Sequence, residues 1–417
     1  MGASPSVPLP EREHADFVRY GTSVYKGEVM RWKDGRCIPD GAGIYTWHRD
    51  ADWLKYKRYT TYEGEWRRFK QHGHGVYTHA NGSGYVGEWY KGTRDGVGIE
   101  NGVDWKGQWT TYDGYFRADQ RHGCGILTTS DGYVYEGEWE NGTKSGRGVE
   151  RWPDGRKYDG EWLSGKRDGN GSSVFSDGWY EGEWQGGQRH GVGTCVWGDR
   201  VGDGDGHRYH GEWAFDVQEG CGKCTYANGD EYDGKWSKGK RHGQGTLIEA
   251  SLTKYQGEWV DDAQEGYGVM ASAHDAELGR AAESYHGHWH AGRKHGEGSS
   301  SFAADGSRYD GQYAFGEPHG RGRYEWADGS AYTGEWEHGV MAGHCKFTFS
   351  NGAKYDGDYC ELLAEQKRAH AFTRYDQGAL LWQSQAAHDL QDLVAACAAG
   401  LPAEGDRDHE DDAPMHE

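Results

Sequence analysis

The sequence predicts an all-β fold, an elongated single-sheet solenoid of consecutive antiparallel β-hairpins with a C-terminal α-helical segment. Three observations predict it. A five-residue motif, Tyr-x-Gly-x-aromatic, recurs along most of the 417 residues, and Asp-Gly or Asn-Gly pairs separate many of its copies. The chain also holds 70 glycines and 20 tryptophans but no long apolar run. A repeat of this length is one supersecondary unit, which buries its apolar face only against its neighbours.

The motif starts at fourteen tyrosines, the first of which heads a divergent copy. Nine of the thirteen intervals are 22–24 residues, and the others are 37, 27, 29 and 30 residues. The fourteen are Tyr25, Tyr62, Tyr85, Tyr112, Tyr135, Tyr158, Tyr180, Tyr209, Tyr232, Tyr255, Tyr285, Tyr309, Tyr332 and Tyr355.

Each copy predicts one β-hairpin. Tyr135, Gly137 and Trp139 share one face of a strand because successive side chains alternate. We expect the glycine to leave a gap for a ring from the neighbouring strand. The alternate face is polar, with a glutamate usually before the tryptophan. Pairs such as Asp154-Gly155 indicate type I′ turns, which need positive φ at both central residues.

Charge and composition exclude several classes of protein. Lys and Arg number 46 against 67 Asp and Glu, a net charge of −21, which argues against nucleic-acid binding. We find no signal peptide and no apolar stretch near 20 residues, so we expect neither secretion nor a membrane span. The cysteines are mostly scattered singly, which is typical of a reducing compartment.

These motifs closely resemble the MORN (membrane occupation and recognition nexus) repeat family. The resemblance runs from Tyr25 to about Tyr359 and rests on Tyr-x-Gly-x-Trp, Gly-x-x-x-Gly-x-Gly and Asp/Asn-Gly. It implies an elongated, twisted solenoid. At about 4.8 Å per strand, fourteen repeats would span roughly 130 Å. MORN-rich proteins of this kind resemble components of cilia, flagella, basal-body regions and other cytoskeletal structures, often as homodimers. The family name derives from a second role, the recognition of phosphoinositides at membranes.

The repeats leave little room for a catalytic domain. We expect an N-terminal extension over 1–24, the solenoid over 25–359, a helical cap or partner helix over 360–400 and an acidic disordered tail over 401–417. Neither end reaches the ~100–150 residues of an ordinary domain. The sequence shows no phosphate-binding loop, nucleophile elbow or zinc-hydrolase motif. We therefore predict no enzyme activity and no cofactor.

The irregular intervals place extra residues at one edge. From the second glycine of Gly-x-Gly to the next motif tyrosine the usual separation is 10 residues, but it is 14 after Gly98, 16 after Gly193 and 17 after Gly268. These insertions fall where one hairpin joins the next. Insertions on one edge often mark the binding side of a repeat protein, although drift in a tolerant loop explains them equally.

The first repeat carries the longest insertion. Trp53, Lys55, Lys57 and Arg58 mix aromatic and basic side chains there, a candidate site for a lipid headgroup or an acidic polypeptide. The alternative is an N-terminal cap with solvated charges.

A basic rim recurs in the loops before Gly-x-Gly. We take it as a candidate surface for a charged filament or an anionic membrane, and a need for solubility predicts the same residues. The rim comprises Arg94, Arg121, Lys166, Arg167, Arg189, Lys240, Arg241, Arg293 and Lys294.

Histidines recur in the same loops, where we predict a structural role. Equivalent positions in adjacent hairpins lie about 9–10 Å apart, too far for two ligands of one zinc ion. Cys221 and Cys224 lack a second ligand pair nearby, so we predict no metal site there either. The histidines are His72, His122, His190, His242, His295 and His319.

The two ends suggest further sites. Gly2 fits the loose N-myristoylation pattern. Residues 379–399 predict an amphipathic helix with Leu390 and Val394 near one face, followed by the stop Gly400-Leu401-Pro402. This helix either caps the last hairpin or binds a partner.

The sequence therefore predicts a cytoplasmic, non-catalytic scaffold of a cytoskeletal assembly, in a cilium or flagellum. Its partners would be cytoskeletal or ciliary proteins, and the resemblance also allows a homodimer. The alternative is a peripheral membrane tether that binds anionic phospholipids. The acidic net charge favours the scaffold, because an anionic leaflet attracts basic segments.

Overall fold

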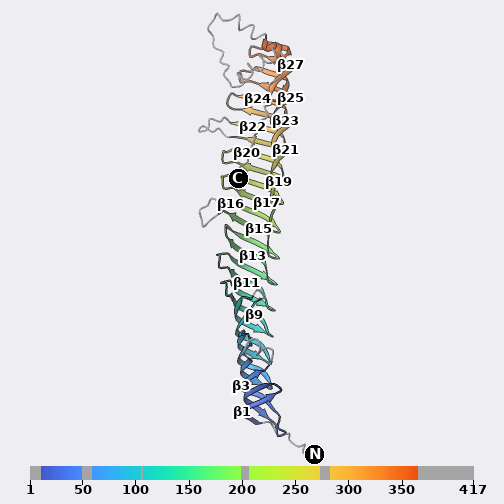
Figure 1. The fold of residues 1–417 in the computed structure, drawn as a ribbon. Coiled ribbons are helices and arrows are strands. Elements are labelled where there is room, and N and C mark those ends of the chain that lie inside the picture. Colours follow the sequence, from blue (N-terminus) through green and yellow to red (C-terminus); the bar gives the residue numbers. More distant parts are fainter. Residues whose placement is uncertain (1–10, 49–58, 105–106, 199–205, 273–281, 365–417) are drawn as a thin grey trace, which may run out of the picture. The chain divides into compact units, whose positions relative to one another are not determined.

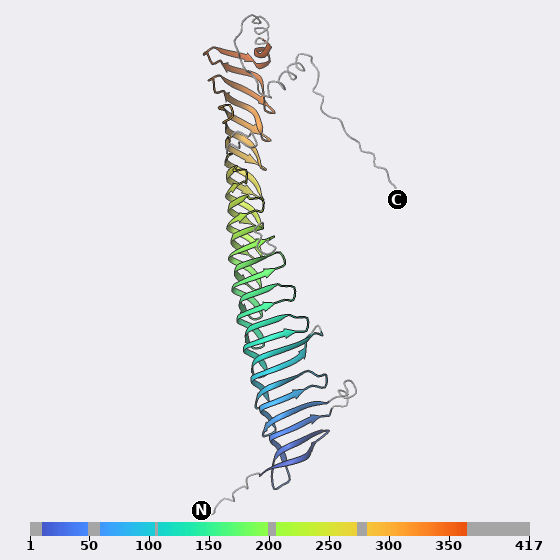
Figure 2. The same ribbon diagram turned by 90° about the vertical axis from the view of Figure 1, so that its left-hand side faces the viewer.

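The computed structural model describes residues 11–48, 59–104, 107–198, 206–272 and 282–364. Two compact units make up the chain: Met1–Ala250 with Trp259–Asp262, and Ser251–Glu258 with Ala263–Glu417. Both consist of β-strands in antiparallel hairpins that follow one another along the chain, which confirms the predicted fold class. Figures 1 and 2 show the strands of each unit stacked in chain order.

In the first unit each strand after β1 pairs with the strand before it in the chain. The strands of this unit are β1 (Glu11–Tyr20), β2 (Ser23–Arg31), β3 (Cys37–Trp47), β4 (Thr60–Arg67), β5 (Lys70–Thr78), β6 (Gly84–Tyr90), β7 (Thr93–Val103), β8 (Trp109–Arg117), β9 (Gln120–Thr129), β10 (Val134–Glu140), β11 (Thr143–Arg151), β12 (Lys157–Leu163), β13 (Lys166–Phe175), β14 (Gly178–Gln185), β15 (Gln188–Trp197), β16 (His207–Ala214), β17 (Val217–Thr225), β18 (Glu231–Ser237) and β19 (Lys240–Ile248).

The second unit continues the same pattern. β20 (Lys254–Val260) has residues in both units. The remaining strands are β21 (Ala263–Ala271), β22 (Glu283–His290), β23 (Arg293–Phe302), β24 (Ser307–Ala314), β25 (Glu317–Glu325), β26 (Ala331–Glu337), β27 (Val340–Thr348) and β28 (Lys354–Asp358).

Both ends of the repeat array carry additional structure. Within the region assigned to the N-terminal extension, β1 pairs with β2 and so belongs to the sheet. A short helix over residues 359–364 follows β28. Tyr359 and Leu362 are buried in it, and the ring of Tyr359 lies 5.4 Å from that of Tyr332. The predicted helix over 379–399 lies outside the described residues.

An aromatic ladder forms the core of each unit. The ring of Tyr135 lies edge-on to Trp139 of its own strand and to Trp162 of the next repeat, with centroids 5.2 and 5.3 Å apart. Edge-to-face pairs at this distance stabilise beyond the area they bury. The indole of Trp162 also donates a hydrogen bond to the carbonyl of Gly148, at 3.2 Å. Each ring therefore binds one repeat to the next.

The glycines of the motif make room for a tyrosine ring. Gly137 pairs with Gly148 across the hairpin. A Cβ on Gly148 would lie 2.4 Å from the hydroxyl oxygen of Tyr135. The ring beside Gly148 of β11 thus comes from the neighbouring strand β10. A Cβ on Gly137, the glycine between the two aromatics, would lie 2.5 Å from the Cα of Gly148 and 2.8 Å from the hydroxyl oxygen of Tyr135. Beside Gly137 the ring therefore belongs to the tyrosine of its own strand and not, as expected, to the neighbouring strand. The tyrosine hydroxyl donates to the carbonyl of Glu138 at 3.0 Å.

The glutamate before the tryptophan has a specific partner. The strand register shifts between Gly137 and Glu138, which forms a bulge. The side chain of Glu138 accepts a hydrogen bond from the amide of Arg147 there, at 3.1 Å. Other side chains at this position bind the equivalent amide: Glu28, Glu65, Glu88, Glu183, Glu212 and Gln312.

The assignment of turn types was wrong. Asp154-Gly155 belongs to a longer connection in which the amide of Gly155 donates to Trp152 and that of Trp152 donates to Arg156. Only the glycine has positive φ, at 90°. This geometry is a three-residue loop with a left-handed glycine. From β4 onward turns with two positive-φ residues lie at the other end of each hairpin, as in the type I′ turn at Asn141 and Gly142, with φ of 49° and 80°.

The longer connections lie where they were predicted. The longer connections span residues 104–108, 198–206 and 272–282. The strands on either side show that each of them stands in place of a three-residue loop like the one at Asp154-Gly155. All of them therefore join one hairpin to the next, as does the insertion within residues 48–59 of the first repeat.

Candidate interaction surfaces

The basic rim is built into the core of the hairpins. Arg121 faces Phe116 across its type I′ hairpin. Its guanidinium lies 4.8 Å from the ring centre of Tyr112 and 5.4 Å from that of Trp139. It also donates to Glu100, at 2.8 and 3.0 Å. Although burial opposes it, Arg121 and then Arg94 hold the pKa of that carboxyl below its usual range.

The rim arginines at the equivalent position of other hairpins make similar contacts. Arg189 lies 4.4 Å from the ring of Trp213, and Arg241 lies 4.4 Å from that of Trp259. Arg167 covers Tyr158 at 4.6 Å and pairs with Glu150 at 3.4 Å. The exposed fraction of each side chain is 21–24 %, as it is for Arg121. These guanidinium groups cover rings and neutralise carboxylates.

In the second unit the two predicted rim residues differ. The amine of Lys294 lies 5.0 Å from the ring of Tyr285 and pairs with Glu283. Arg293, the residue before it, is exposed. Lys166 and Lys240 in the first unit are exposed at the matching position. The rim thus combines partly buried cations that support the core with exposed cations beside them.

Aspartates at the turns fasten successive repeats in the first unit. Asp216 has φ of 69°, a conformation that favours glycine. Its carboxylate accepts from both the amide and Nε of Arg189, at 3.0 and 3.1 Å. Asp262 makes the same contacts with Arg241, and Asp119 makes them with Arg94. The ion pairs offset the conformational cost of aspartate at this position.

The predicted histidine ladder occupies a capping position. This position follows the residue that pairs with the motif tryptophan across the hairpin, and it faces the turn of the next repeat. Where it is acidic, it accepts an amide hydrogen bond from that turn, as Asp168 does from Gly186 at 3.0 Å and Glu219 does from Lys238 at 2.9 Å. His72 stands in this place, with Nδ1 3.5 Å from the amide of Lys91. Nδ1 of His122 and of His190 is buried without a hydrogen-bond partner.

No metal centre is found within the described ranges, where no three His, Cys, Asp or Glu side chains gather closely enough to hold an ion. Cys224 is buried, and burial raises the pKa of its thiol to about 11, whereas Cys221 is exposed. Of the helices in the described part of the chain, none is long and apolar enough to cross a membrane.

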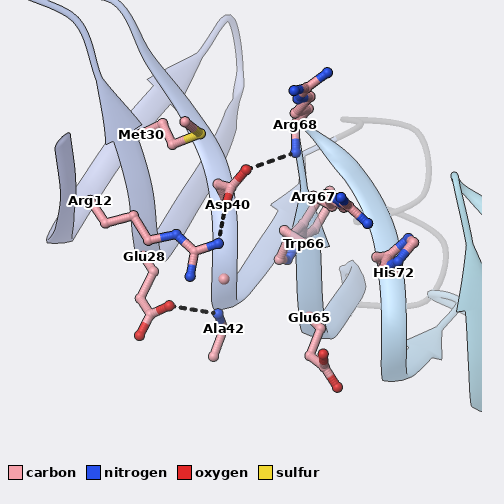
Figure 3. A pocket seen from close by; sticks show the side chains of 11 residues that line it. Arg12, Glu28, Met30, Asp40, Ala42, Glu65, Trp66, Arg67, Arg68 and His72 are labelled. Atoms are coloured by element: carbon pink, nitrogen blue, oxygen red, sulfur yellow. Dashed lines mark hydrogen bonds and ion pairs between the residues drawn. The ribbon is translucent and has the colours of Figure 1, made fainter. Parts of the chain in front are cut away.

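A polar cleft of about 570 Å³ lies at the N-terminal end of the first unit (Figure 3). Asp40, 4 % exposed, accepts a 2.6 Å hydrogen bond from Arg12 and one from the amide of Arg68 at 3.2 Å. Three basic and three acidic side chains line the cleft. They are Arg12, Arg67 and Arg68, and Glu28, Asp40 and Glu65. The opposite charges balance, and the contacts of Asp40 join β1 and β3 to the turn after β4.

Several predicted site residues lie outside the described residues. They are Gly2, Trp53, Lys55, Lys57, Arg58, Leu390 and Val394. Sequence reasoning in turn missed an apolar surface on β5 to β9. The signal for it was present, because valine and isoleucine replace polar residues at the alternate positions of these strands.

Together these features define a repeat protein of stacked β-hairpins. A model of the MORN repeat matches twelve segments: residues 62–84, 85–109, 112–132, 135–155, 158–179, 180–200, 209–231, 232–248, 255–273, 285–307, 309–331 and 332–354. The matches cover more than half of the chain, which therefore belongs to the MORN repeat family. The two other predicted copies begin at Tyr25 and Tyr355, in β2 and β28.

A search of curated proteins finds no match. The family defines the chain as a protein-interaction or membrane-binding repeat protein, of a kind that is generally non-catalytic.

Proposed function

We propose that the chain is a cytoplasmic, non-catalytic scaffold of a cytoskeletal assembly, in a cilium or flagellum, and that its repeats hold protein partners. The proposal refines the protein-interaction role of MORN repeats. The kind of assembly comes from the sequence resemblance.

One observation carries the choice of protein partners over a membrane. Attraction to an anionic leaflet comes from basic side chains near its surface, at about 1 kcal/mol for each. Arg121, Arg189 and Arg241 have carboxylate partners and cover rings. Their charge is therefore neutralised within the repeats. The net charge of −21 adds a repulsive field around the whole chain.

The second candidate is a peripheral membrane tether. The exposed Lys166, Lys240 and Arg293 favour it, because they leave positive charge on the rim. They are few, however, because the cation next to each of them is neutralised, and the chain as a whole is strongly acidic.

Vesicle sedimentation separates the two candidates. The full chain is mixed with vesicles of phosphatidylcholine that contain phosphatidylserine and a phosphoinositide, at low and physiological salt. The scaffold proposal predicts that the protein stays in the supernatant at physiological salt. Sedimentation with the vesicles, lost in the variant Lys166→Gln/Lys240→Gln/Arg293→Gln, would replace the scaffold by the tether.

Two sequence predictions that concern mostly residues outside the described ranges are also proposals. Charge reversal of Lys55, Lys57 and Arg58 is expected to weaken assembly without unfolding the repeats. Removal of residues 360–417 is expected to leave the repeats folded but to alter partner docking or self-association. Unchanged pull-down yields would exclude the basic patch, and loss of cooperative unfolding after truncation would make the C-terminal region a structural cap.

A further inference from the structure

An apolar surface lies on the outer face of β5 to β9, opposite the aromatic core. Its side chains are 39–53 % exposed, although they are large and apolar. They belong to five successive strands of the first unit, and we call them the apolar patch. The patch comprises Val76, Val86, Val97, Ile99, Val103, Trp109, Tyr115 and Ile126.

Cross-strand pairs join most members of the patch, and Asp113 lies between Ile99 and Ile126. Val76 pairs with Val86, and Val86 pairs with Ile99. In the next row Val97 pairs with Tyr115, and beyond the polar pair of Asn101 and Thr111 Val103 pairs with Trp109. A soluble chain rarely leaves a contiguous apolar surface of a few hundred Å² exposed, and such surfaces mark interaction sites.

The repeat itself does not require apolar residues here. Later strands of the first unit carry polar residues at the position of Val86 and Ile99, among them Ser172, Glu181 and Thr194. Those strands keep the same pairing and the same buried tyrosines. The patch is therefore a local property of β5 to β9, separable from folding.

The geometry selects a helix as the occupant. Each of β5 to β9 is hydrogen-bonded to a strand on both sides, so none offers a free edge to an added strand. An open sheet face is covered by a helix or by another sheet. Five strands at about 4.8 Å spacing span roughly 19 Å, and a helix of about 13 residues is as long.

The charges around the patch select a basic helix. One cross-strand row runs Glu63, Val76, Val86, Ile99, Asp113, Ile126 and Glu136. The row contains three carboxylates and no basic residue; Glu136 also pairs with Arg151 of β11 at 3.6 Å, which leaves Glu63 and Asp113 beside the patch. A helix that presents an apolar stripe at i, i+3, i+4 and i+7 with lysines or arginines beside it matches both features.

We propose that the apolar patch docks a basic amphipathic helix of a partner protein. The inference rests on the proposed scaffold function and names the chemistry of one partner. The predicted helix of this chain over residues 379–399 is a poor match, because it contains Asp389 and Asp392 and no Lys or Arg.

A defined peptide tests the patch on the full chain. The probe is a fluorescein-labelled 14-residue peptide of leucine and lysine with leucine at i, i+3, i+4 and i+7. Its affinity is compared for the wild type, for Val86→Thr/Ile99→Thr and for the matched control Val174→Thr/Val192→Thr. The control residues are equally exposed but lie on β13 and β15. All three proteins have the same charge, and threonine occurs naturally at this position as Thr194.

We expect the patch variant to raise Kd by about tenfold and the control to leave it unchanged, because two buried aliphatic contacts are lost. A peptide with glutamate in place of lysine should not bind. Equal affinity of the two variants would overturn the proposal. Three other results would also overturn it, if the patch variant abolishes them: self-association of the chain, binding of the chain to vesicles, and inhibition of peptide binding by residues 365–417. Each of them would assign the patch to another occupant.

The results distinguish failure of this inference from failure of the scaffold proposal. If the peptide does not bind but the chain stays in the detergent-insoluble cytoskeleton of cells, only the helix-docking inference is wrong. If the peptide binds through the patch but detergent releases the chain from cells, only the scaffold proposal is wrong.

Discussion

Glu138 closes the bulge of its hairpin by accepting a hydrogen bond from the backbone amide of Arg147, at 3.1 Å. The bulge arises because Gly146 has φ of 57°, and a Cβ there would lie 2.4 Å from the same carboxylate. The glutamate of the motif and the first glycine of Gly-x-Gly are therefore two halves of one structural device.

Removal of this carboxylate should destabilise one hairpin locally. We expect Glu138→Ala to lower the local stability by ~1 kcal/mol, since the amide of Arg147 loses its partner. Glu138→Gln should have little effect, because Gln312 makes the same bond to the amide of Arg321 at 3.0 Å. Hydrogen exchange of β10 and β11 measures both. Equal exchange rates in the alanine and glutamine variants would contradict the assigned role.

Two glycines of one strand should respond oppositely to alanine. A Cβ on Gly98 would lie 2.3 Å from the hydroxyl of the buried Tyr85, so we expect Gly98→Ala to cost about 1–3 kcal/mol. At Gly102 the nearest atom is 3.9 Å away. Gly102→Ala should be neutral or stabilise by up to about 1 kcal/mol, because alanine lowers the conformational entropy of the unfolded chain. Urea unfolding measures the difference, and equal losses would contradict the packing described.

Much of this fold follows from period and alternation alone. The spacing of Tyr135, Gly137 and Trp139 predicts one buried strand face, and the unequal intervals predict the edge that holds the long connections. Both predictions depend only on backbone geometry. The turn at Asp154-Gly155 did not follow, because Asp-Gly fits a two-residue turn and a three-residue loop equally well, and the pairing of the strands decides between them.

The roles of charged side chains were harder to predict. Arg121 and Arg293 occur in similar loops of the sequence, yet one covers rings and the other is exposed. The difference is one residue of register, which decides whether a side chain faces the core. The apolar patch was missed for a related reason, since Val86 and Ile99 stand far apart in sequence and adjoin only across strands.

The ion pair between Arg189 and Asp216 should couple two repeats. Arg189→Gln is a mild change, because Gln218 occupies the equivalent position of the next repeat. We expect it to destabilise by about 0.5–1 kcal/mol, and Asp216→Gly to cost less because glycine relieves the positive φ. A double-mutant cycle measures the coupling. Strict additivity would show that the pair contributes nothing.

The tyrosine ladder predicts alkaline instability. Burial raises the pKa of Tyr85, of Tyr112 and of Tyr285 to about 12, whereas an exposed phenol ionises near 10. The folded state thus favours the neutral phenols. Their contribution to stability is complete below pH ~10 and is lost as the pH rises towards ~12. Urea unfolding and tyrosinate absorbance along this range measure the loss. Ionisation of these tyrosines near pH 10 without unfolding would contradict their burial.

The proposed scaffold is tested most directly in cells that express the tagged chain from its native locus. The cells are imaged, extracted with detergent and imaged again. We predict that the protein stays in the insoluble cytoskeleton, along the axoneme or at its base. Complete release of a signal that coincides with a membrane would contradict the scaffold and establish the tether in its place.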